Sequence, residues 1–196
     1  MKDYRDDVHV LDLILKYTDR FGSLPIYFED VKPFLDYFIN PENLIRELEK
    51  KVDHQNISIS NIRKHINVQK IIYYFSKSIT LTKKKIMILG WIQMYNKSLA
   101  LGIDLDEREM QYGDDYVLLA VVTLLEEYYR NHQKHLLYDC LLLLEYALEK
   151  SKYNFYFKIV MIRIYLELNG YQEALRLYDS LEIKQVQHES LSYFIF

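Results

Sequence analysis

Residues 165–181, YLELNGYQEALRLYDSL, carry the clearest fold signal in this chain. It connects the end of an apolar helix to an amphipathic helix through Asn169-Gly170, two residues that favour a helix end and a turn. Apolar residues follow the turn at helical spacing, and the small Ala174 among them allows two helices to approach closely. The stretch therefore predicts a pair of helices joined by a tight turn.

A similar spacing occurs about 34 residues earlier, the period of tetratricopeptide-type helix pairs. Leu137, Cys140, Leu144 and Ala147 there take the positions of Tyr171, Ala174, Tyr178 and Leu181. Leu181 departs from the pattern, which has a small residue at that position. We find no such repeat in the first half. The predicted fold is all-α, a tetratricopeptide-like helical repeat array (α-solenoid), with degenerate or unrecognised repeats in 1–105 and tetratricopeptide-like pairs in 106–196.

Helical periodicity covers most of the chain. Pro33 is tolerated only in the first turn of a helix, so we expect the second helix to begin near Asp30. The expected helices span residues 6–20, 30–39, 41–52, 59–75, 86–101, 114–129, 136–150, 154–168 and 171–181, with polar connections at 77–85 and 104–113.

Composition favours a helical, intracellular protein. The 196 residues include only five glycines and three prolines, few for a β protein of this length. A formal net charge of −3 argues against a broad nucleic-acid-binding face. The N-terminus is too charged for a secretory signal, and the longest apolar stretch, residues 116–125, is too short to span a bilayer. We expect no contact with a membrane.

No pattern in the sequence predicts a catalytic or cofactor site. The glycines are isolated, which excludes a P-loop, a dinucleotide fingerprint and the glycine-containing turn that binds coenzyme A in acetyltransferases. Cys140 lies among leucines, which predicts an inert core thiol. Asp114-Asp115 resembles a catalytic carboxylate pair, but it is better interpreted as a helix N-cap with a favourable helix-dipole charge. We therefore expect no cofactor and no direct small-molecule ligand.

Two further clusters have residue types that could form binding sites. His132 and His135 could place two metal ligands together, but too few other ligands lie nearby for a metal site. The three lysines 83–85 could contact an acidic surface such as RNA, although three charges provide only modest, salt-sensitive binding. A solvated loop is the preferred interpretation of the lysines.

Several segments resemble the auxiliary, non-catalytic subunit of the NatB N-terminal acetyltransferase. They are Gly113-Asp114-Asp115-Tyr116, Phe157-Lys158, Arg163-Ile164-Tyr165 and residues 181–191, together with residues 17–22 and 28–35 near the N-terminus. The stretch 184–191 is the most specific of them. Members of this family are several times longer, so the chain resembles only part of such a subunit.

The resemblance implies a non-catalytic scaffold in the cytoplasm. In that family a tetratricopeptide-type superhelix wraps the catalytic subunit of NatB and helps attach it to the ribosome. The complex acetylates nascent chains that begin Met-Asp, Met-Glu, Met-Asn or Met-Gln. Lys184, Gln187 and His188 lie beside an apolar run in the most specific stretch, so we expect them to bind a partner protein; alternatively, they pack within the array.

Two other functions remain open. A stand-alone adaptor would grip short peptides in a groove lined by basic or amide side chains, and Lys158 and Arg163 are the candidates for it. An unrecognised enzyme would need a positioned acid, base or nucleophile, which the sequence does not supply.

Overall fold

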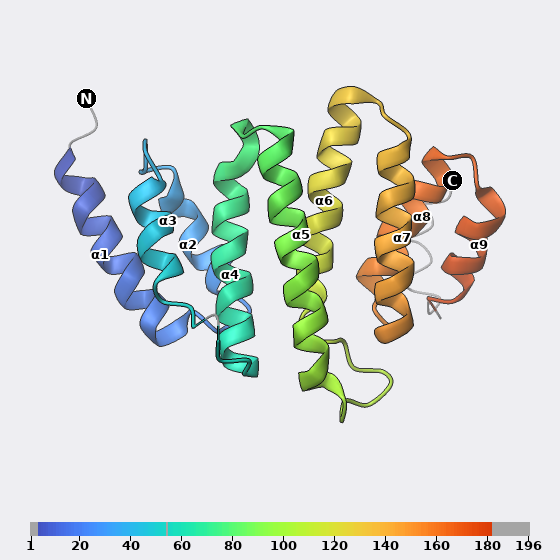
Figure 1. Ribbon diagram of the computed structural model, residues 1–196, viewed down its shortest axis with the longest axis horizontal. Helices are drawn as coiled ribbons and strands as arrows, with labels where there is room; N and C mark the ends of the chain where they lie inside the picture. The colour runs from blue at the N-terminus through green and yellow to red at the C-terminus, as the bar shows by residue number, and fades with distance from the viewer. Residues whose placement is uncertain (1–3, 54, 182–196) are drawn as a thin grey trace, which may run out of the picture. The chain divides into compact units, whose positions relative to one another are not determined.

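The computed structural model describes residues 4–53 and 55–181, and every regular element in those ranges is a helix (Figure 1). The chain divides into two compact units, residues 1–103 and 104–196, which we describe separately. The repeat content predicted above for residues 1–105 and 106–196 stays a prediction.

The first unit contains five α-helices and two short 3₁₀ turns among its described residues. They are α1 (Tyr4–Phe21), α2 (Tyr27–Leu35), α3 (Glu42–Glu49), α4 (Ile59–Phe75), η1 (Ser76–Ser78), α5 (Leu81–Ser98) and η2 (Leu99–Gly102). Helices α1 to α4 pack around one core. Its buried members are Ile14, Tyr27, Val31, Leu35, Leu44, Leu48, Val52, Val68 and Ile71.

Buried polar side chains fix the connection between α1 and α2. Thr18 donates to the Ile14 carbonyl oxygen at 2.7 Å, so the Tyr27 hydroxyl, 2.5 Å away, donates to Thr18 Oγ1. From α4, the Asn67 amide donates to the carbonyl oxygens of Gly22 and Leu24 at 2.9 and 2.8 Å. These hydrogen bonds satisfy carbonyl oxygens of the turn that would otherwise have no partner.

Several helix boundaries in this unit differ from the sequence-based prediction; for example, α2 ends at Leu35 and not at residue 39. Helix α2 begins at Tyr27 instead of near Asp30, and Pro33 lies inside it. Burial of Tyr27, Val31 and Leu35, spaced four residues apart, outweighs the backbone hydrogen bond that proline removes. Helix α5 begins at Leu81, so lysines 83–85 lie in a helix and not in a loop, with Lys84 fully buried.

The described residues of the second unit, 104–181, form four α-helices that stack in chain order. They are α6 (Asp114–Asn131), α7 (His135–Lys150), α8 (Phe155–Glu167) and α9 (Tyr171–Asp179), all close to their predicted spans. Helix α6 packs on α7, α7 on α8, and α8 on α9. This neighbour-to-neighbour packing, in an all-helical structure, confirms the predicted fold class of an all-α helical repeat array.

The turn between α8 and α9 has the predicted geometry. Asn169 takes a left-handed conformation with φ 61°, which asparagine tolerates better than most residues. The Gly170 N–H donates to the Tyr165 carbonyl oxygen at 2.7 Å. A Cβ at position 170 would lie 3.1 Å from a Tyr165 ring carbon, so the turn favours glycine there.

Helical spacing predicts an inward-facing apolar stripe on α9 that includes Tyr171, Ala174 and Leu175, and this prediction is wrong in part. Ala174 is buried, as expected from its small size, but Tyr171 and Leu175 are 64% and 51% exposed. Within the described residues α9 packs mainly on α8, and that contact covers only the Ala174 side of the helix.

Among the described residues, we find no helix long and apolar enough to cross a membrane.

Candidate protein-binding surfaces

The three residues predicted to bind a partner, Lys184, Gln187 and His188, lie outside the described residues. Their role as binding residues therefore stays a prediction. Surface grooves are present in both units, and we describe one in each. Both are formed where neighbouring helices leave room between their side chains.

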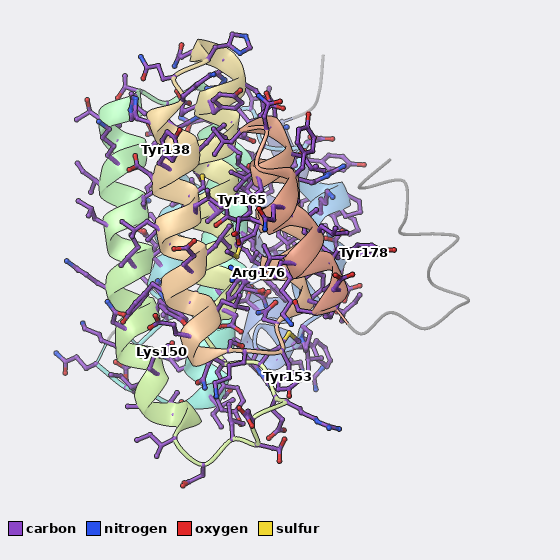
Figure 2. The ribbon with its side chains drawn as sticks, turned by 90° about the vertical axis from the view of Figure 1, so that its right-hand side faces the viewer. Tyr138, Lys150, Tyr153, Tyr165, Arg176 and Tyr178 are labelled. Carbon is purple, nitrogen blue, oxygen red and sulfur yellow. The ribbon has the colours of Figure 1, made fainter. Side chains whose placement is uncertain are left out.

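The groove in the second unit lies between α7 and α9, with α8 also contributing to its lining, and has a volume of about 500 Å³. Figure 2 shows Tyr165 and Arg176 in the space between α7 and α9. We call it the α7–α9 groove. Its lining residues are Glu145, Leu148 and Glu149 from α7, Met161 and Tyr165 from α8, and Arg176 and Leu177 from α9.

The α7 side of this groove is acidic. The Tyr165 hydroxyl donates to Glu145 Oε1 at 2.8 Å. Burial, with the nearby Glu145 carboxylate, raises the pKa of Tyr165 to about 12, so the phenol remains a donor at neutral pH. Across the groove, Arg176 pairs with Glu173 at 2.6 Å. The positive charge of the groove thus has its own counterion.

The groove in the first unit lies between α1 and α2 and has a volume of about 400 Å³. It is lined by Val10, Leu13, Ile14, Tyr17, Asp30, Val31 and Phe34, so it is apolar apart from one carboxylate. That carboxylate, Asp30, accepts a hydrogen bond from the Tyr17 hydroxyl at 2.6 Å. The Asp30 carboxylate raises the pKa of Tyr17 through this bond.

The candidate residues for an adaptor groove, Lys158 and Arg163, do not line one surface. Lys158 is buried, and its Nζ donates to the Ser180 carbonyl oxygen at the end of α9, 2.8 Å away. A cation at a helix C-terminus is favoured by the helix dipole. Lys158 therefore secures α9 to α8, whereas Arg163 is exposed on α8. The prediction that both residues line a binding face is wrong for Lys158.

Asp114 is a structural carboxylate at the junction of three helices. Its Oδ2 accepts hydrogen bonds from Ser151 Oγ and Asn154 Nδ2, both at 2.7 Å, and from the Gln111 N–H at 3.1 Å. Its Oδ1 is buried and accepts no hydrogen bond from the described residues. Burial raises the pKa of Asp114 to about 6, although the hydrogen bonds oppose the rise.

This arrangement explains the carboxylate pair seen in the sequence. Asp114 is the first residue of α6, and Gly113 occupies the position before the helix. The predicted N-cap is therefore wrong, because the Asp114 side chain does not cap α6. The Asp114 carboxylate instead accepts hydrogen bonds from Ser151 and Asn154, which ties the start of α6 to the end of α7 and the start of α8. Asn154 in turn accepts from the Tyr156 and Phe157 N–H groups and caps α8.

The remaining candidates have no site around them in the described part of the chain. Cys140 is fully buried, and burial raises its pKa to about 12, which confirms an inert core thiol. His132 and His135 are exposed, and His132 ends α6 in a left-handed conformation with φ 51°. Among residues 4–53 and 55–181 we find no cluster of three or more ligands that could hold a metal ion.

Sequence reasoning missed the acidic wall formed by Glu145 and Glu149. Their spacing of four residues places them on one side of a helix, and this pattern could have been recognised in the sequence. Exposed Leu142 lies on the same side, and an amphipathic helix normally has polar residues there. That mixture of acidic and apolar residues on an outer face is the feature that could have identified the groove.

Comparison with known proteins agrees with the resemblance seen in the sequence. The chain is 27% identical to human N-alpha-acetyltransferase 25, NatB auxiliary subunit, over 94% of its length and 20% of the relative's. It is 25% identical to subunit arm1 of the N-terminal acetyltransferase B complex of Schizosaccharomyces pombe, over 93% of this chain and 24% of that protein. The auxiliary subunit NAA25 of Arabidopsis thaliana is 22% identical over 97% of this chain and 18% of its own length.

The chain thus spans about a fifth of the length of these relatives. The match to the family itself extends over the whole chain, residues 1–196. The family is one of non-catalytic subunits, in agreement with the prediction that the chain is not the enzyme. This chain belongs to the family of the non catalytic subunit of the N-acetyltransferase B complex (NatB).

Proposed function

We propose that this chain is part of a scaffold subunit that holds the catalytic subunit of NatB in the cytoplasm. The observation that carries the proposal is the match of all 196 residues to the non-catalytic subunit family. The array of stacked helices supports it, because such arrays present extended surfaces on which a partner is held by many modest contacts.

In this role the chain would also help to attach the complex to the ribosome. The complex would then acetylate nascent chains that begin Met-Asp, Met-Glu, Met-Asn or Met-Gln. Tetratricopeptide-type curvature would allow the array to wrap the smaller catalytic subunit.

Co-expression with the catalytic subunit of NatB tests the scaffold role. The expected result is a complex that elutes as one species in size-exclusion chromatography. A folded, helical chain that never co-elutes with the catalytic subunit would contradict the proposal for these 196 residues.

The same assay tests Lys184, Gln187 and His188. Replacing all three with alanine is expected to weaken co-elution if they contact the partner. The matched control replaces His9, Lys83 and Gln93, exposed residues of the same three types in the first unit. Equal retention of the catalytic subunit by both triple variants would show that residues 184, 187 and 188 have no binding role.

A stand-alone adaptor for short peptides is the alternative function, and the α7–α9 groove favours it. Because Lys158 is buried, such an adaptor could not use the basic face expected from the sequence. Saturable binding of peptides by the chain, with no association with an acetyltransferase, would favour this alternative.

A further inference from the structure

We propose that the α7–α9 groove is a docking surface for a basic amphipathic helix of a partner protein, one with arginine or lysine at positions i and i+4 beside a leucine stripe. The proposal goes beyond the scaffold role and does not depend on it. It is based on the charge, spacing and apolar floor of the groove.

The charge of the groove favours a basic partner. Glu145 receives its hydrogen bond from a neutral phenol and, among the described residues, is in no ion pair. Glu149 forms an ion pair with its neighbour Lys150 at 4.0 Å, and its side chain is 72% exposed, so this pair contributes little. Arg176 is already paired with Glu173. A basic side chain can therefore pair with Glu145 and compete with Lys150 for the exposed Glu149, whereas a nucleic acid would be repelled.

The spacing of the carboxylates favours a helix. Glu145 and Glu149 are one helical turn apart on the same side of α7. A second helix lying along α7 presents residues i and i+4 with the same repeat, so two basic side chains could face the two carboxylates. The bond from Tyr165 holds the Glu145 carboxylate in place before binding, which lowers the entropy lost on association.

Apolar surface lies next to the acidic wall. Leu148, Met161 and Leu177 line the groove. Tyr138 and Leu142 are 60% and 69% exposed, and they extend the side of α7 that carries Glu145 and Glu149 (Figure 2 labels Tyr138). Exposed apolar residues grouped beside exposed charges are typical of a protein interface. The leucine stripe of the partner would cover this surface.

Fluorescence anisotropy of the full chain with a labelled peptide tests the proposal. The probe is a helical peptide of about 18 residues, long enough to form a helix, with two arginines one turn apart beside a leucine stripe. The reference peptide has glutamates in place of the arginines. The expected result is saturable binding of the arginine peptide, weakened by salt because exposed charges are screened. Equal binding of both peptides, or none, would overturn the proposal.

Groove variants make the test specific. The double variant E145Q/E149Q is expected to weaken binding of the arginine peptide by about tenfold, since two exposed ion pairs are lost. The charge-matched control E42Q/E49Q, on exposed residues of α3, is expected to bind as the unaltered chain does. Equal affinities for the two double variants would overturn the proposal.

Sedimentation of the chain alone addresses a different occupant. The unaltered chain and E145Q/E149Q are expected to sediment identically as monomers. A dimer that dissociates in E145Q/E149Q would show that a second copy of the chain occupies the groove, and it would overturn the proposal of a basic partner helix.

Discussion

Helices α7 and α9 have the same spacing of repeat residues, but they are buried to different extents. At the four matched positions of α7, Leu137, Cys140, Leu144 and Ala147 are all buried. On α9, Ala174 is buried but Tyr171, which corresponds to Leu137, is 64% exposed. The difference arises because α7 packs on both α6 and α8, whereas α9 packs mainly on α8 within the described residues.

The comparison shows what one repeat can and cannot specify. The spacing of residues sets which side of a helix is able to pack. The number of neighbouring helices decides how much of that side is removed from water. Equivalent substitutions in the two helices should therefore have unequal effects on stability.

The largest expected effect is that of Leu137→Ala in α7. Leu137 is 1% exposed, so its truncation should lower the free energy of unfolding by about 2–5 kcal/mol, through lost burial and the cavity left behind. Urea denaturation followed by circular dichroism measures the change. A loss below about 1 kcal/mol would mean that α7 is not held between two helices as described.

The second effect concerns the junction at the end of α7. The pKa of Asp114 is raised from its usual value near 3.8 to about 6 by burial. The stabilising contribution of this group is thus complete below pH 3.8 and is lost as the pH rises through about 6. Asp114→Asn stays neutral, so its stability relative to the unaltered chain should increase between pH 4 and pH 8, by on the order of 2–3 kcal/mol.

Denaturation of both chains across that pH range tests this prediction. The matched control is Asp179→Asn, which removes a carboxylate from the exposed end of α9. Parallel pH profiles for Asp114→Asn and the unaltered chain would show that Asp114 has no raised pKa.

A smaller effect is expected at the turn between α8 and α9. Asn169 has a φ of 61°, which a β-branched residue adopts only with strain. Asn169→Val should cost about 1–2 kcal/mol, whereas Asn169→Gly should be near neutral. Hydrogen exchange of the α9 amides distinguishes loss of this turn from global unfolding. Equal stability of the valine and glycine variants would contradict the left-handed geometry.

The smallest effect is expected for Tyr171→Ala at the start of α9. This side chain is largely exposed, and its hydroxyl makes one exposed hydrogen bond, to Asn169 at 3.2 Å. Its removal should change the free energy of unfolding by no more than about 0.5 kcal/mol. A cost as large as that of Leu137→Ala would show that Tyr171 is covered in solution, and the contrast between α7 and α9 would no longer hold.

Much of the fold could be predicted from the local sequence. Periodicity predicted α4 and α6 to α9 to within a few residues, and the Asn169-Gly170 turn was correctly identified. The errors occur at helix boundaries that are set by contacts with residues distant in the sequence. Helix α2 begins at Tyr27 because the core of the first unit buries that ring, and α5 begins at Leu81 although three lysines follow.

The candidate site was less predictable than the fold. No sequence pattern revealed that Lys158 would turn inward to the end of α9, because its partner, the Ser180 carbonyl oxygen, lies 22 residues away. The α7–α9 groove is formed by three helices, and its boundaries depend on how closely α7 and α9 pack on α8. Such distances are set by side-chain packing and not by periodicity.

The helical class, the α8–α9 turn and the buried state of Cys140 could all be predicted from the sequence, because each depends on residue types at fixed local spacing. The tertiary structure alone decided which faces remain open, where Lys158 points, and that Asp114 joins three helices. These features depend on which helices become neighbours, and that follows from the sum of many contacts between residues far apart in the chain.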